Sequence, residues 1–153
     1  MPATNARAID VANAAVTVLT ANQGGFAQTF TPARDYIPLF PLEQAKLTAG
    51  VYVTVIPAVL DEESLSRLSV QGIVAIDVGV QKYAPDLATR DQMMLLAEQV
   101  KTVMEKGLVL PEAAIDCGWQ RTENDPLYST EHLIKFGVFT TLPRFFYLTR
   151  RAR

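Results

Sequence analysis

Cysteine and histidine, which commonly act as a nucleophile and as a general base, are scarce in this sequence of 153 residues. Cys117 is the only cysteine and His132 the only histidine. A reactive thiolate needs nearby cations or a helix N-terminus, and only Arg121 lies close to Cys117 in the sequence. We therefore expect Cys117 to be buried and inert. A histidine base needs another group to orient it, and nothing around His132 supplies one. We place His132 in a short helical turn before a strand, and expect both residues to be dispensable for chemistry.

Motifs that bind phosphate, dinucleotides or zinc are absent from the sequence. It has no G-x-x-x-x-G-K-[ST] loop, no G-x-G-x-x-G turn, no H-E-x-x-H helix and no G-x-S-x-G elbow. Gly24-Gly25 fits the end of a helix instead. One cysteine and one histidine cannot form a site of several Cys or His ligands, nor an intrachain disulfide. We predict no catalytic residues, no cofactor, no metal and no enzymatic activity.

Charged residues form two clusters of opposite sign. We interpret the acidic run Asp61-Glu62-Glu63 as a solvated loop, because calcium needs roughly six to eight oxygen ligands, usually at alternating positions. The second cluster is basic, and it either binds phosphate or forms a solvated tail. Its members are Arg144, Arg150, Arg151 and Arg153. Asp77 stands alone inside an apolar strand. Strand alternation favours a solvent-facing position for it, and the functional alternative is a charge paired across a subunit contact.

The composition indicates one globular domain. Hydrophobic residues make up 49% of the chain, enough for a substantial core. The net charge of −2 argues against a general nucleic-acid binder. No run approaches the roughly 20 apolar residues of a membrane span, and we recognise no signal peptide. We predict a single domain over residues 1–153, with a flexible N-terminus at 1–5 and a basic tail at 150–153.

Two segments have the apolar periodicity of amphipathic helices. One covers residues 5–22 and ends at Gly24-Gly25. The other covers residues 87–106, where Lys106-Gly107 places a cation and a flexible residue at the helix end. The apolar stripe of this second helix consists of Met93, Leu96, Val100 and Val103, with Met104 beside it.

Four segments have the alternation or the β-branched and aromatic content of strands. They are residues 51–56, 67–82, 114–119 and 133–147. Pro57 closes the first, and residues 57–66 are expected to form a polar loop. In the second, the even-numbered positions from Val70 to Val80 share one face, while the other face is mixed. This pattern is typical of an antiparallel strand with a partly covered outer face. Pro143 is expected at a bulge or an edge.

Residues 26–40 are aromatic but interrupted by Pro32 and Pro38, which favours an edge strand or an extended arm. The whole order is helix, strands, helix, strands, and not a regular βαβ alternation. We therefore predict an α/β fold of the α+β type. Its central sheet is mostly antiparallel or mixed, and helices pack on one face.

The order of elements and three stretches of sequence resemble the tail terminator, or tail completion, family of long-tailed bacteriophages. These are minor tail proteins that form a ring at the head-proximal end of the tail tube. The first stretch is the N-terminal helix, the aromatic segment and the strand at 51–57. The second is 73–82 followed by the helix containing 95–100. The third is 125–133, then 138–141 and the aromatic finish at 145–148.

The resemblance implies a homohexameric ring that contacts a tail tube protein on one side and a neck or connector protein on the other. It also implies a place in the virion after synthesis in the host cytoplasm, with DNA passing through the ring and no membrane contact. The family provides no catalytic residues to carry over. Two alternatives stay open: another head–tail connector or head-completion protein, and a small-molecule-binding or enzymatic domain whose site is not visible in the sequence.

Five residues are our candidates for subunit contacts: Tyr36, Phe40, Glu62, Asp77 and Arg144. The two aromatic residues lie on the proline-marked arm. In a ring, one surface of a subunit meets a different surface of the next subunit. Opposite charges at 61–63 and 144–153 would fix the direction of such a contact more than its affinity.

Overall fold

One long strand, β3 (Ser69–Tyr83), organises the fold in a computed structural model that describes residues 6–64, 66–110 and 116–152. β2 (Tyr52–Ser64) pairs antiparallel with one edge of β3 over its full length. Along the other edge, β6 (Val138–Thr141) pairs with the end of β3, and β7 (Arg144–Ala152) pairs with its beginning. β3 therefore has neighbours on both sides, as expected for a central strand.

In the described ranges the sheet has seven strands, in the order β1-β2-β3-β7-β5-β4 with β6 beside β3. β1 (Pro32–Arg34) runs parallel to β2, and the other pairings are antiparallel, so the sheet is mixed. The predicted single-domain α+β class is confirmed. The remaining elements are α1 (Arg7–Ala21), η1 (Gln23–Gly25), η2 (Leu42–Leu47), α2 (Leu87–Met104), β4 (Leu108–Val109), β5 (Asp116–Glu123) and α3 (Thr130–Phe136).

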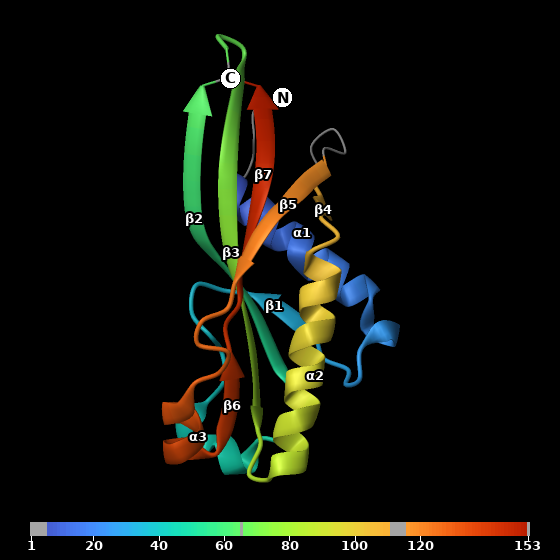
Figure 1. Ribbon diagram of the computed structural model, residues 1–153, viewed down its shortest axis with the longest axis vertical. Helices are drawn as coiled ribbons and strands as arrows, with labels where there is room; N and C mark the ends of the chain where they lie inside the picture. Colours follow the sequence, from blue (N-terminus) through green and yellow to red (C-terminus); the bar gives the residue numbers. More distant parts are fainter. Residues whose placement is uncertain (1–5, 65, 111–115, 153) are drawn as a thin grey trace.

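Helices α1 and α2 cover one face of the sheet, which we call the inner face (Figure 1). The core between them is apolar because the even-numbered residues of β3 point into it, as the alternation predicts. Val74, Ile76, Val78 and Val80 are all fully buried there. The predicted stripe of α2 faces the same core through Met93, Leu96, Val100 and Met104. None of the helices in the described ranges is long and apolar enough to cross a membrane.

The opposite, outer face is covered only at one end. There η2 and α3 pack over the sheet, around a small cluster of Phe40, Ala45 and Val138 (Figure 1). Beyond this end, β2, β3 and β7 continue away from α3 as a ribbon of three strands (Figure 1). We call this ribbon, residues 59–64, 69–75 and 147–152, the tip.

The predicted loop at 57–66 is wrong, because β2 continues through Asp61-Glu62-Glu63 to Ser64. A register shift between Pro57 and Val59 absorbs the proline without ending the strand. Pairing with β3 satisfies the backbone, so the polar side chains can remain in solvent on a regular strand.

The predicted strand at 133–147 is also wrong, because three elements occupy the segment. Ser129 caps α3 by accepting a hydrogen bond from the His132 amide at 3.2 Å, and Gly137 ends the helix with a φ of 66°. Pro143 then separates β6 from β7, while its carbonyl still accepts a bond from the Val78 amide at 3.0 Å. Residues 150–152, predicted as a tail, continue β7 instead. The predicted flexible segment 1–5 lies outside the described residues.

Candidate assembly surface

Cys117 is buried in the core, as the sequence predicts. Its side chain is fully shielded, on β5 opposite Leu108 of β4. Burial raises the pKa of this thiol to about 12, and the nearby Arg7 offsets only part of that effect. Burial and the raised pKa both disfavour the thiolate, which is the form that acts as a nucleophile or a metal ligand.

His132 lies in the first turn of α3, in agreement with the predicted helical turn. Its Nδ1 is 2.8 Å from the hydroxyl of Thr140, which also accepts a hydrogen bond from Gln81 at 3.2 Å. The neighbouring hydroxyl of Ser129 is occupied as the cap of the same helix. The contacts from His132 to Thr140 and from Gln81 to Thr140 tie α3 to β6 and β3. Among the described residues, no group of three or more His, Cys, Asp or Glu side chains could hold a metal ion.

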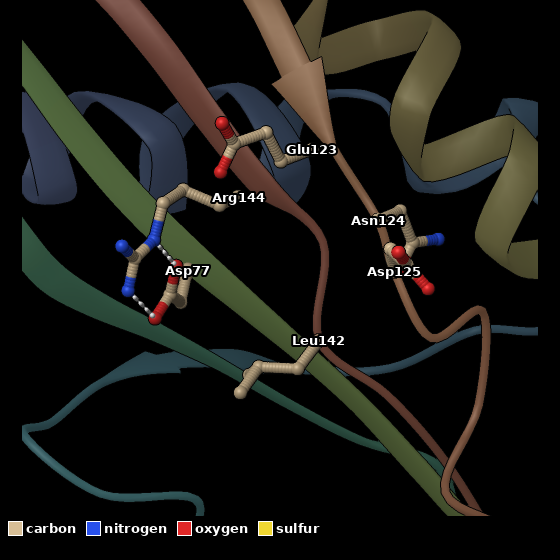
Figure 2. Close-up of a pocket in the computed structure, with 6 residues that line it drawn as sticks. All are labelled: Asp77, Glu123, Asn124, Asp125, Leu142 and Arg144. Carbon is tan, nitrogen blue, oxygen red and sulfur yellow. Dashed lines mark hydrogen bonds and ion pairs between the residues drawn. The ribbon is translucent and has the colours of Figure 1, made fainter.

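The strongest polar contact on the outer face joins two of the predicted contact residues to each other. Arg144 donates to Asp77 through Nε at 2.7 Å and through Nη2 at 3.1 Å, in a bidentate ion pair between β7 and β3 (Figure 2). The side chain of Asp77 is only 13% exposed. This hydrogen bonding raises the pKa of Arg144, so the guanidinium stays charged. Asp77 and Arg144 thus neutralise each other within one subunit.

Further charges continue this arrangement across β7 and β5. Glu123 lies opposite Arg144 in the strand register and forms an ion pair with Arg121. The Arg121 guanidinium lies 3.9 Å from the centre of the Phe146 ring, which is close enough for a cation–π contact. We call Asp77, Arg144, Glu123, Arg121 and Phe146 the waist. Its charges alternate in sign and are satisfied internally, so it has little need of an outside partner.

A pocket of about 580 Å³ opens beside the waist. Figure 2 shows Leu142 on one side and Asn124 and Asp125 on the other, while Asp77 and Arg144 face each other. The only guanidinium that lines this pocket is already bound to a carboxylate. The remaining carboxylates have neither a neighbouring histidine nor an unengaged cation among the pocket's lining residues. Arg144 is thus engaged by Asp77, and Glu123 forms an ion pair with Arg121.

The acidic run lies along the tip, on both faces of β2. Asp61 and Glu63 share the outer face with their partners on β3, Ile73 and Gln71. Glu62, the predicted contact residue, lies on the other face. On that face Gly72 of β3 has no side chain, so the Glu62 side chain can lie over it. A Cβ at Gly72 would come within 2.9 Å of the Glu62 Cγ. Asp61 and Glu63 are thus better placed than Glu62 for an outside contact.

The aromatic arm divides into an exposed and a buried part. Tyr36 and Ile37 are 64% and 67% exposed, and the Arg34 guanidinium lies 5.7 Å from the Tyr36 ring. Phe40 is buried within its own subunit, edge-to-face with Tyr52 at 5.2 Å. Of the two predicted aromatic contact residues, only Tyr36 lies at the surface.

Sequence reasoning missed Arg121 and the position of Arg150. Arg150 lies in β7 and pairs with Gln71 of β3, which pairs on its other side with Glu63. The alternation Arg144, Phe146, Leu148, Arg150 was the available signal, because its period of two marks one face of a strand.

Comparison with known proteins finds similarity in structure. No protein-family model and no curated protein matches this sequence. The chain is similar in structure to a chain of a solved structure described as the virion of a native gene transfer agent particle, with a TM-score of 0.59 and 19% sequence identity. The alignment covers 97% of this chain and 100% of that chain. The two chains share a fold over almost their whole lengths.

Proposed function

We propose that this protein is a structural subunit of a phage-like virion, and that it caps the head-proximal end of a tail tube as a ring. The observation that carries the proposal is the shared fold. The similarity extends over 97% of this chain to a chain found in a gene transfer agent virion. The resemblance of three sequence stretches to tail terminators specifies the position within the particle.

The chemistry of the described residues supports a role in assembly. The one thiol is buried and protonated, and the one histidine is bound to Thr140. The outer face at the tip instead carries charged side chains that are exposed at strand edges, Asp61 and Glu63 on β2 and Arg150 on β7. Such a surface suits contacts with other protein subunits, where charges select the partner and its orientation.

The proposed partners are further copies of this chain, a tail tube protein below the ring and a neck or connector protein above it. The number of six copies rests on the family resemblance alone. DNA would pass through the ring without specific recognition, which agrees with the net charge of −2. The proposed location is the head–tail joint of the particle, after synthesis in the host cytoplasm.

Electron microscopy of particles that carry an affinity tag on this protein tests the proposal. A gold label should appear at the junction of head and tail, and particles with the untagged protein provide the control. Cells that lack the protein should make tails that end irregularly and do not join heads, because nothing stops or caps the tube.

The same images separate the alternatives. Label on isolated tubes, at one end only, supports a tail cap. Label on tailless heads, with bare tubes, would instead support a head-completion protein. Particles of normal shape and number without the protein would contradict a structural role.

A further inference from the structure

The tip has two strand edges that differ in chemistry. On the β2 side, β1 pairs only with residues 53–55, so residues 57–64 have no described strand partner on the edge away from β3. On the β7 side, β5 pairs only as far as Leu148, so residues 149–152 likewise have no described partner away from β3. Unpaired edges offer backbone groups to another strand. Within the part of the chain that the structure describes, the tip is therefore a short ribbon with two open sides.

The two edges carry opposite charge on the same face. The strand register aligns Glu63 of β2, Gln71 of β3 and Arg150 of β7 in one row across the tip. Asp61 lies one step along β2 from Glu63 on this face. Glu63, Asp61 and Arg150 are all exposed. One edge is thus acidic and the other basic.

A small hollow marks the acidic edge. It has a volume of about 160 Å³ and is lined by Asp61, Glu63, Gln71, Gly72 and Ile73. Two carboxylates, those of Asp61 and Glu63, flank it. Paired carboxylate oxygens match the fork of an arginine guanidinium better than the single ammonium of a lysine.

We propose that the acidic β2 edge of one copy pairs with the basic β7 edge of the next copy, with Arg150 of that copy seated between Asp61 and Glu63. This inference rests on the proposed ring, for which it names the contact surface. β2 and β7 run in the same direction, since both are antiparallel to β3. The joined strands would be parallel, and the sheet would continue from subunit to subunit.

The charges also explain why the contact is head-to-tail. Two β2 edges placed together would bring carboxylates against carboxylates, and two β7 edges would bring arginines together. Like charges directly opposite each other destabilise strand pairing. Pro57 and the register shift beside it shorten the edge that any other strand could use. A symmetric dimer is disfavoured on both sides, whereas a heterologous contact satisfies both edges.

Cysteine cross-linking tests the contact directly. In one subunit, Glu63 and Arg150 flank Gln71, so their Cα atoms are about 10 Å apart by strand spacing. A disulfide requires less than about 7 Å, so the variant Glu63→Cys/Arg150→Cys can bridge only between copies. Cys117→Ser serves as the background, and Asp91→Cys/Arg150→Cys, with Asp91 exposed on α2, is the matched control.

The expected result is a ladder of covalent oligomers from Glu63→Cys/Arg150→Cys under mild oxidation, and no ladder from the control. A mixture of the two single variants should give one dimer band that neither gives alone. Dimers of Glu63→Cys alone would overturn the head-to-tail contact. An oligomer that light scattering detects but that gives no cross-links between these positions would also overturn it. A protein that stays monomeric at every concentration, with and without tail tubes, would do the same.

The outcomes separate this inference from the proposed function. If the label appears at the head–tail joint but residues 63 and 150 do not cross-link, the proposed cap stands and the proposed edge contact is contradicted. If the protein forms cross-linked rings but never appears on particles, the proposed edge contact stands and the proposed function is contradicted.

Discussion

The two faces of the sheet have different roles, although the same strands form both. On the inner face, β3 contributes an unbroken series of valine and isoleucine residues to a core shared with α1 and α2. On the outer face, the same strand contributes Gln71, Ile73, Ala75 and Asp77. The inner face holds the subunit together through apolar burial, which is the dominant stabilising contribution in folding.

Within the outer face, charges are used in two ways. At the waist, Asp77 and Arg144 form a closed pair, and Arg121 lies on Phe146. At the tip, Glu63 and Arg150 lie at opposite edges with Gln71 between them. Charges that pair within the subunit fix the register of the strands. Charges at the unpaired strand edges can instead contact another molecule. The following predictions test this division, from the largest expected effect to the smallest.

Val74→Asp should be the most damaging change, because it buries an unpaired charge in the core. Val74 is fully buried, so we expect a loss of at least about 3 kcal/mol in the free energy of unfolding. Urea unfolding followed by circular dichroism measures it. The matched control is the adjacent Ile73→Asp on the outer face, where 37% of the side chain is exposed. Equal losses in the two variants would show that the faces are assigned wrongly.

Tyr147→Phe should reveal a polar anchor of the inner face. The buried hydroxyl of Tyr147 donates to the carbonyl of Met104 at 2.7 Å and ties β7 to the end of α2. Its removal leaves that carbonyl unsatisfied, at an expected cost of about 1–2 kcal/mol. Thermal unfolding provides the measurement, and the exposed Tyr36→Phe provides the control. No change in Tyr147→Phe would mean that water replaces the lost bond.

The waist pair should contribute about 1 kcal/mol, because the Arg144 side chain is 38% exposed and solvent screens it. A double-mutant cycle with Asp77→Asn and Arg144→Gln isolates this coupling. We expect each single change to destabilise the subunit and the double change to cost less than the sum of the two. Neither should weaken assembly, since the pair is closed within one subunit. If a stably folded Arg144→Gln protein failed to assemble, Arg144 would have to be part of the subunit contact, as the sequence analysis predicted.

Much of this division was predictable from the sequence. The even-numbered series from Val70 to Val80 identified the inner face, because a period of two specifies which side chains share a face of a strand. The helix at 87–106 followed from its stripe. The strand at 57–64 was not predictable by the same reasoning. Its acidic residues are typical of a loop, and only the pairing with β3 reveals a strand.

The waist could not be predicted, because its members are far apart in the chain. Asp77 and Arg144 are 67 positions apart, and their pairing depends on the register between β3 and β7. β7 keeps the register that β6 has with β3 across Pro143, and a sequence pattern does not resolve that register. The opposite edges of the tip depend on the same register.

Alkaline pH should slightly lower the free energy of unfolding through the buried thiol of Cys117. Burial raises the pKa of Cys117 to about 12, above the value of about 8.5 in an unfolded chain. Since the folded pKa is the higher one, this contribution to stability is complete below about pH 8 and is lost as pH rises toward 12. Between about pH 7 and 9, wild type should lose less than about 1 kcal/mol relative to Cys117→Ser. A constant difference between the two proteins over this range would contradict the burial of the thiol. Cys117→Ser and His132→Gln should both remain functional if they fold.

Complementation between charge-reversed variants tests the account most directly. Glu63→Arg would place an arginine against Arg150 of the next copy, and Arg150→Glu would place a carboxylate against Asp61 and Glu63, so neither variant should form rings on tail tubes at low salt. A mixture of the two should alternate around the ring and restore assembly, while each variant alone keeps a wild-type unfolding curve. Electron microscopy of tube ends, with the percentage of capped ends as the readout, makes the comparison. We predict few caps for each variant alone and near wild-type capping for the mixture. Equal capping by all samples would contradict the edge contact.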